Sequence, residues 1–294
     1  MHIAHIVTLI IYIYIVATYL QTINTTCKNT CLVFGLLLLT SLNLPAQPAP
    51  PDHSRQFILK AGPVLTRQSF IDKYFSSQPY DGSIPGADLG IEIHTRKAFH
   101  ELAVFFSAGT TSPGTSSHSD AKTIYAGVDY SHLYAMAQNK NGQLQWLAGG
   151  AVSYIYSHRY YSGFINNANS FESALSLGVV VKAVYNFKQL AGFSISDKLV
   201  IPVFTLLLQP SYGSQDIEGD QNGNGTSLKS IVSASRFVTF GSYSRITNCL
   251  VLCKKITEHH AVSAEYCIDY YHVATLRPVK HATQRFVLSY QLMF

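Results

Sequence analysis

The sequence has few charged residues, one tryptophan and, beyond its N-terminus, no long apolar run. Charged residues make up 13% of the 294 positions and hydrophobic residues 47%, whereas a soluble domain usually carries about a quarter charged residues. A helical membrane protein needs apolar runs of roughly 20 residues. The composition therefore disfavours an ordinary soluble domain and a bundle of transmembrane helices, and it leaves a large soluble β-sandwich as a rival.

Cysteine is also scarce. The chain has five cysteines, and three of them, Cys249, Cys253 and Cys267, lie beyond the N-terminal region. An odd number without a repeated spacing argues against a disulfide scaffold. Cys249 and Cys253 are four residues apart in a strand-like segment, or roughly 13 Å, which is too far to bridge. Pairing of Cys267 with either one across a hairpin remains a minor hypothesis.

Residues 1–46 are expected to form an N-terminal apolar extension and a secretory signal peptide. Lys28 precedes the apolar core Cys31–Leu42, and the small residue Ala46 stands at the expected cleavage position. A Pro-rich linker over 47–54 would then lead into the folded region, 55–294. The further apolar stretch Ile3–Leu20 is open to three readings: a membrane anchor, an extended n-region, or translated upstream sequence.

From residue 55 onward, apolar and polar residues alternate with a period of two. The last strand, Arg285–Phe294, has the clearest pattern. One face carries Phe286, Leu288, Tyr290, Leu292 and Phe294, and the other carries Arg285, Val287, Ser289, Gln291 and Met293. The segment 172–188 is about twice as long as a strand of a soluble protein, as a tilted membrane-crossing strand would be. The pattern predicts an all-β, antiparallel up-and-down transmembrane β-barrel.

We expect about ten strands, with eight or twelve as alternatives. The predicted ranges are 55–67, 85–96, 100–111, 121–138, 143–158, 172–188, 198–212, 229–256, 260–276 and 284–294. Short turns alternate with long loops, as they do in outer-membrane barrels. Two places fit poorly. The connection 189–197 is long for a turn, and the segment 229–256 is too long for one strand and is expected to break near Gly241–Ser244.

Charged residues of both signs fall on the polar side of these strands. They are Glu92, His94, Arg96, Asp129, Lys182, Glu265, Asp269 and Arg285. A barrel of about ten strands has a narrow interior, so unpaired charges there would be costly and we expect them to form a network. The network would belong to a plugged, structural barrel or, alternatively, would line a narrow polar channel and set its selectivity.

Three sequence features resemble the small outer-membrane β-barrels of the porin-family, OmpA/OmpX-like type common in Bacteroidota. They are the signal ending Leu44–Gln47, the opening strand Phe57–Gly62 and the terminal Tyr290–Phe294. In such barrels a C-terminal Phe with apolar or aromatic residues at alternate positions is recognised by the barrel-assembly machinery. The resemblance implies that Tyr290, Leu292 and Phe294 form that signal, and it implies no catalytic residue.

Patterns for catalysis and metal binding are missing. Barrel phospholipases and lipid A deacylases use a His and a Ser two residues apart, and no His-x-Ser occurs here. Asp269 and His272, three residues apart, should point to opposite faces and so do not match the Asp–His pair of outer-membrane proteases. The acidic run Asp216–Asp220 is expected to be a solvated loop more than a calcium site. We therefore predict no catalytic, cofactor-binding or metal-binding residue.

The expected function is that of a bacterial outer-membrane barrel, exported by its signal peptide, with a structural, adhesive or recognition role through its surface loops. A narrow pore or small-solute transporter is the first alternative, and an envelope lipid hydrolase with an unrecognised site is the second. Outer-membrane lipid and the assembly machinery are the expected partners. Because the net charge of +5 forms no basic block, no nucleic acid is expected.

Overall fold

The computed structural model of the chain describes residues 55–73, 78–95, 98–114, 120–139, 141–161, 169–188, 190, 192–209, 235–239, 241–274 and 278–294. The predicted signal peptide, the linker, Arg96 and the acidic run 216–220 lie outside these residues. Within the described part of the chain, no helix is long and apolar enough to cross a membrane.

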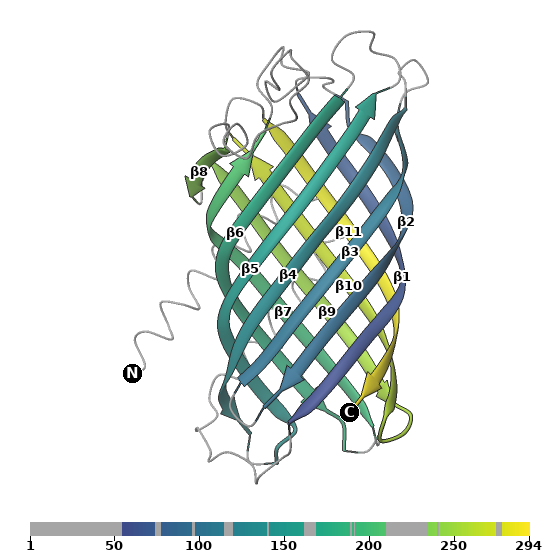
Figure 1. The fold of residues 1–294 in the computed structure, drawn as a ribbon, viewed down its shortest axis with the longest axis vertical. Coiled ribbons are helices and arrows are strands. Elements are labelled where there is room, and N and C mark those ends of the chain that lie inside the picture. The colour runs from purple at the N-terminus through teal and green to yellow at the C-terminus, as the bar shows by residue number, and fades with distance from the viewer. Residues whose placement is uncertain are drawn as a thin grey trace, which may run out of the picture. The chain divides into compact units, whose positions relative to one another are not determined.

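The described residues form a single closed antiparallel barrel (Figure 1). Its strands are β1 (Gln56–Asp72), β2 (Tyr80–His94), β3 (Ala98–Pro113), β4 (Ala121–Gln138), β5 (Leu144–Tyr161), β6 (Asn169–Asn186), β7 (Phe193–Leu208), β8 (Ser235–Thr239), β9 (Tyr243–Lys255), β10 (His260–Val273) and β11 (Val279–Met293). Sequential strands pair, and β1 closes the barrel by pairing with β11 from Ile58↔Met293 to Asp72↔Val279.

The barrel has ten strand positions, because β8 and β9 together occupy one. Both run antiparallel to β7, with β8 pairing at Phe204–Leu208 and β9 at Phe193–Val200. The strand, not the polypeptide, is interrupted between β8 and β9, where Gly241 takes a φ of +122° that other residues rarely adopt. The predicted break in the segment 229–256 is therefore present, but the chain does not reverse there, and the predicted count of ten is confirmed.

Connections of two kinds alternate along the barrel. The end that carries 95–97, 139–143, 187–192 and 256–259 also holds both the start of β1 and the end of β11, and we call it the turn end. The opposite end, with 73–79, 114–120, 162–168, 209–234 and 274–278, is the loop end. The prediction of a long connection at 189–197 is wrong, because β7 already begins at Phe193. Ser194 and Ser196 alternate with apolar residues and continue the ladder with β6.

The outer wall is apolar and the inner wall is polar. On β11 the outward Leu288 exposes 52% of its surface, whereas the inward Ser289 exposes 7%. Leu, Phe, Val and Tyr recur at outward positions of the other strands, and inward positions hold buried Ser and Thr, such as Ser107, Ser153 and Thr205. A soluble protein would have the opposite distribution. An apolar outer face around a polar interior is the pattern of a barrel that sits in lipid.

The terminal strand has the two faces predicted for it. Arg285, Val287 and Met293 are buried, whereas Phe286 and Tyr290 are about half exposed on the outside. Phe294 closes the seam: its N–H donates to the carbonyl of Phe57 (2.8 Å), and the N–H of Phe57 donates to the carbonyl of Phe294 (3.2 Å). The predicted alternation in this strand is confirmed, and its role as an assembly signal stays a prediction.

Candidate functional site

The inward side chains of the barrel form the candidate site. Because strand residues alternate between the two walls, every second residue of each strand reaches the lumen. Some of the ion pairs and hydrogen bonds there join neighbouring strands, whereas others join strands that are not neighbours in the sheet and so cross the lumen.

Two ion-paired groups lie toward the turn end. Lys60 on β1 pairs with Glu92 on β2, and His94 Nε2 lies 3.0 Å from the second oxygen of Glu92. Glu101 on β3 accepts from Lys182 Nζ of β6 (2.5 Å) and from Lys198 Nζ of β7 (3.1 Å). Since β3 is separated from β6 and β7 by other strands, this second group spans the interior.

Asp269 on β10 organises the next group. Arg245 of β9 donates to both its oxygens, from Nε (2.9 Å) and Nη2 (2.8 Å), and Tyr125 Oη of β4 donates to Oδ2 (2.8 Å). Thr247 adds a fourth bond, and Arg245 Nη1 reaches Ser153 on β5 at 2.9 Å. Both charged groups are 2% exposed, so their burial is matched by hydrogen bonds from both sides of the lumen.

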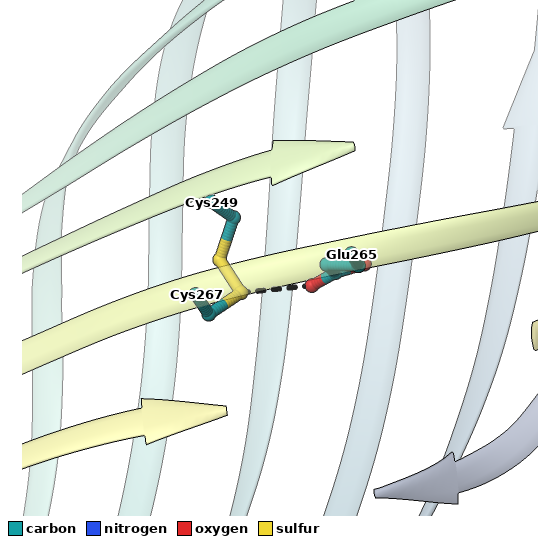
Figure 2. A group of neighbouring side chains, drawn as sticks. All are labelled: Cys249, Glu265 and Cys267. Carbon is teal, nitrogen blue, oxygen red and sulfur yellow. Dashed lines mark hydrogen bonds between the residues drawn. A yellow bond between two sulfur atoms is a disulfide. The ribbon is translucent and has the colours of Figure 1, made fainter. Parts of the chain in front are cut away.

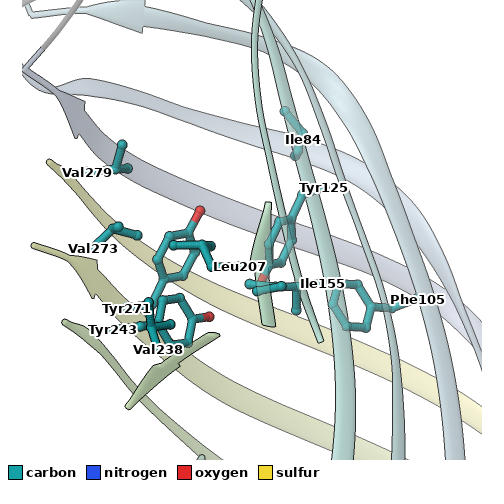
Figure 3. Packing of buried hydrophobic residues seen from close by; sticks show 11 residues of the cluster. Ile84, Phe105, Tyr125, Ile155, Leu207, Val238, Tyr243, Tyr271, Val273 and Val279 are labelled. Atoms are coloured by element: carbon teal, nitrogen blue, oxygen red, sulfur yellow. The ribbon is translucent and has the colours of Figure 1, made fainter. Parts of the chain in front are cut away.

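The loop end is filled by aromatic and aliphatic side chains around one buried arginine. Arg159 lies 3.2 Å from Glu172 and 3.9 Å from Asp72, and its guanidinium stacks over the Phe70 ring. Tyr271 Oη donates to Glu172 at 2.5 Å. Figure 3 shows the apolar cluster at this level. It comprises Ile84, Phe105, Tyr125, Ile155, Ala174, Leu207, Val238, Tyr243, Tyr271, Val273 and Val279.

A cavity of about 70 Å³ borders both the turn-end ion pairs and the Arg245 group. This volume holds a few water molecules. Asp88, Asp129, Glu265 and Arg285 line it, and none of the four has an ion-pair partner within 4 Å among the described residues. The Arg285 guanidinium instead lies over Phe105, 3.7 Å from the ring centre.

A disulfide joins Cys249 on β9 to Cys267 on β10 beside this cavity. The two residues are direct partners in the register, with Cα atoms 4.1 Å apart, and Cys253 remains a free thiol. Glu265 Oε1 lies 2.8 Å from Cys267 Sγ (Figure 2). The hypothesis that Cys267 pairs across the hairpin is thus confirmed, with Cys249 as its partner.

The structure brings most of the predicted lumen residues to the interior. Glu92, His94, Lys182 and Asp269 take part in the contacts above, and Asp129, Glu265 and Arg285 line the cavity. Arg96 lies outside the described residues. Within the part of the chain that the structure describes, the ion pairs of these residues form separate groups at different depths of the barrel.

Sequence reasoning missed several partners. Lys60, Glu101 and Arg245 each form an ion pair with a predicted residue, and Lys198 pairs with Glu101. Arg159 and Glu172 form a loop-end pair that was not expected. The period-two pattern was the signal that could have found them. Lys60 and Arg245, for example, follow the inward phase of their strands.

The pairs tested for catalysis lie as the spacing predicted. Asp269 is buried in the interior, whereas His272 is on the outer wall, and Ser157 and His158 likewise face opposite sides. What the interior offers chemically is a set of fixed charges around a small cavity. A closed barrel with this interior and an apolar outer wall has the architecture of transmembrane β-barrel proteins.

No protein-family model matches the sequence, and no curated protein matches it. Among solved structures, the chain is similar to the outer membrane protease OmpT from Escherichia coli, with 8% identity and a TM-score of 0.45 over 85% of this chain and 99% of that chain. Neisserial surface protein A is similar with 9% identity and a TM-score of 0.35, over 82% and 100%. The attachment invasion locus protein Ail of Yersinia pestis has 10% identity and a TM-score of 0.34, over 81% and 99%. These identities are too low to transfer an activity.

Proposed function

We propose that the chain is a bacterial outer-membrane barrel, exported by its N-terminal signal, that acts through its loop-end surface as a structural, adhesive or recognition protein. The observation that carries this proposal is the filled lumen. Ion pairs cross it from Glu101 to Lys182 and Lys198, a hydrogen bond crosses it from Arg245 to Ser153, and an aromatic cluster fills the loop end. A barrel closed in this way presents its loops and conducts nothing.

Location is tested first. The protein should fractionate with the outer membrane, require detergent for extraction, and migrate faster on a gel when unheated than when boiled. Extraction without detergent and a mobility that does not depend on heating would favour a soluble β-sandwich and overturn the proposal.

Closure of the lumen is tested by conductance in planar bilayers, where the folded protein should give no discrete steps.

Binding through the loops is tested by replacing the connections 114–120, 162–168 and 209–234, one at a time, with Gly/Ser segments of equal length. At least one replacement should reduce binding to a panel of immobilised envelope polysaccharides and matrix proteins, with the turn-end segment 139–143 replaced as the matched control.

A narrow pore is the second candidate, and the cavity favours it. Asp88, Asp129, Glu265 and Arg285 present charges to that cavity without ion-pair partners within 4 Å in the described part of the chain. Fixed charges of this kind set selectivity in narrow channels. Conductance steps in the wild-type protein that change when Asp88→Asn is introduced would replace the closed barrel with this second candidate.

In this proposal the barrel is not an enzyme. Mass spectrometry of lipid A and phospholipids from cells with and without the protein should show the same species in both. A deacylated lipid that depends on the protein would instead support an envelope hydrolase.

A further inference from the structure

We propose that Cys249, Cys267 and Glu265 form a redox-controlled site for a soft or borderline divalent metal such as zinc. The Cys249–Cys267 disulfide holds the site closed, and its reduction opens it. This inference concerns the middle of the barrel and does not depend on the function proposed for the loops.

The three side chains already converge. Cys249 and Cys267 face each other across β9 and β10, and Glu265 reaches the same wall because it stands two residues before Cys267 on β10. One donor atom from each, two sulfurs and a carboxylate oxygen, lies within 4.8 Å of the other two (Figure 2). The barrel wall holds both strands in register, so the ligands are positioned before any metal binds.

The position of Glu265 is unexplained by the disulfide. Its Oε1 lies 2.8 Å from Cys267 Sγ, and a bonded sulfur carries no proton to donate and no positive charge to attract a carboxylate. Among the described residues, no cation lies within ion-pair distance of Glu265. A partly buried carboxylate gains little from such surroundings. Beside a divalent ion, the same carboxylate would be a ligand.

The chemistry of the donors selects the metal class. Two thiolates and one carboxylate are ligands that zinc accepts in tetrahedral sites, and thiolates select against magnesium and calcium. Tetrahedral geometry needs the two sulfurs about 3.8 Å apart, a separation that rotation of the two side chains can provide. Two thiolates and a carboxylate carry three negative charges, so a divalent ion would offset most of them.

The cavity supplies the fourth position. Cys249 and Glu265 both line it, and it is large enough for water. Three protein ligands and one open position toward water is the arrangement of reactive zinc sites, whereas structural sites are closed by four protein ligands. Arg285 and Lys60 line the same cavity and would interact with an anion bound there.

The redox step balances with a dithiol reductant. The protein disulfide and the dithiol exchange, so that the S–S bond of the protein breaks, two protein thiols form and the dithiol becomes a disulfide. A divalent metal then binds both sulfurs and releases two protons. Oxidation by a disulfide of higher potential reverses the first step and expels the metal.

Cobalt(II) is the probe, because its bonds to thiolate absorb in the near ultraviolet and its tetrahedral form absorbs in the visible. The full chain is refolded into detergent micelles with or without a phosphine reductant, and folding is checked by the heat-dependent gel shift. Reduced protein should bind one cobalt per barrel with both bands, and zinc should displace it. Oxidised protein should show neither band.

Matched variants locate the site. Cys249→Ser should abolish the thiolate band, and Glu265→Gln should weaken cobalt binding by about tenfold or more. Cys253→Ser is the control, since Cys253 is a lumenal cysteine on the same strand that is not part of the group. Reduced barrel that folds but gives no cobalt band overturns the proposal, as does reduced barrel that fails to fold. An unchanged affinity in Glu265→Gln, or loss of binding in Cys253→Ser, overturns it too.

Discussion

Arg159 at the loop end and Lys198 at the turn end both pair with a glutamate inside the barrel, but their surroundings differ. Arg159 is 0% exposed and Glu172 3%, and aromatic rings pack around them. Lys198 keeps 20% of its side chain exposed, and it shares Glu101 with Lys182. The buried apolar clusters nearest the turn end contain no fully buried aromatic ring. One consists of Leu133, Leu147, Ala151 and Val180, and the other of Ile58, Ala261 and Met293.

The difference indicates that the two ends are closed by different forces. At the loop end, the charges are desolvated and depend on complete pairing, because water cannot replace a lost partner. At the turn end, partial exposure lets water and salt substitute for part of each ion pair. Loss of a partner should therefore cost more stability at the loop end than at the turn end.

Removing the buried arginine should be the most destabilising of these changes. Arg159→Met leaves Glu172 and Asp72 buried without the cation beside them, and the free energy of unfolding should fall by about 3–5 kcal/mol. Urea unfolding in lipid vesicles, followed by fluorescence of the single tryptophan, Trp146, measures it. The control Lys122→Met removes an exposed cation and should change stability by less than about 0.5 kcal/mol. Equal losses in the two variants would remove the contrast between the ends.

Breaking the turn-end group should cost less and should depend on salt. Glu101→Gln weakens the contacts to Lys182 and Lys198, and we expect a loss of about 1–3 kcal/mol at low salt. Raising the salt to about 1 M should shrink that loss, because screening weakens the ion pairs of the wild type. The loss in Arg159→Met should not change. Glu258→Gln, in an exposed turn, is the control, and a salt-independent loss in Glu101→Gln would contradict the prediction.

Removing one hydroxyl at the loop end tests pairing without disturbing packing. Tyr271→Phe keeps the ring that stacks on Tyr243 but deletes the donor to Glu172, and stability should fall by about 1–2 kcal/mol. Tyr134→Phe removes a hydroxyl from the outer wall, where the side chain is 52% exposed, and should be nearly neutral. If both variants have the same stability as the wild type, hydrogen bonding to Glu172 contributes nothing to closure.

Deleting Phe294 should have the smallest effect on stability and a large effect on assembly. The deletion removes two backbone hydrogen bonds and a ring contact to Phe57 at the seam, worth about 1 kcal/mol in unfolding experiments. In cells, the fraction of heat-shifted barrel in the outer membrane should fall several-fold, whereas Phe294→Tyr should keep it. Normal assembly of the truncated chain would contradict the expected signal at Tyr290, Leu292 and Phe294.

Much of the wall could be predicted from the sequence. The period-two pattern assigned faces in the terminal strand and placed ten strands, because the side-chain direction in a strand depends on local geometry alone. It placed strand ends less well. β1 continues to Asp72 and β5 to Tyr161, beyond the predicted 67 and 158. Ladder hydrogen bonds with the neighbouring strands carry both strands past the point where the alternation fades.

The interior could be predicted only as a set of residues. Asp269 and Lys182 were expected to face the lumen, but Arg245, 24 residues from Asp269, and Glu101, 81 residues from Lys182, were not identified as their partners. Those distances along the chain carry no local signal.

By itself, the sequence determined which residues face lipid and which face the lumen, since alternation is a local property of extended backbone. The tertiary structure decided which lumenal groups meet. Closure of β1 on β11 and the register of each ladder place Glu101 opposite Lys182, and Cys249 opposite Cys267 with Cys253 left free. Such partners are set by the relative shift of neighbouring strands, and that shift depends on closing the whole barrel.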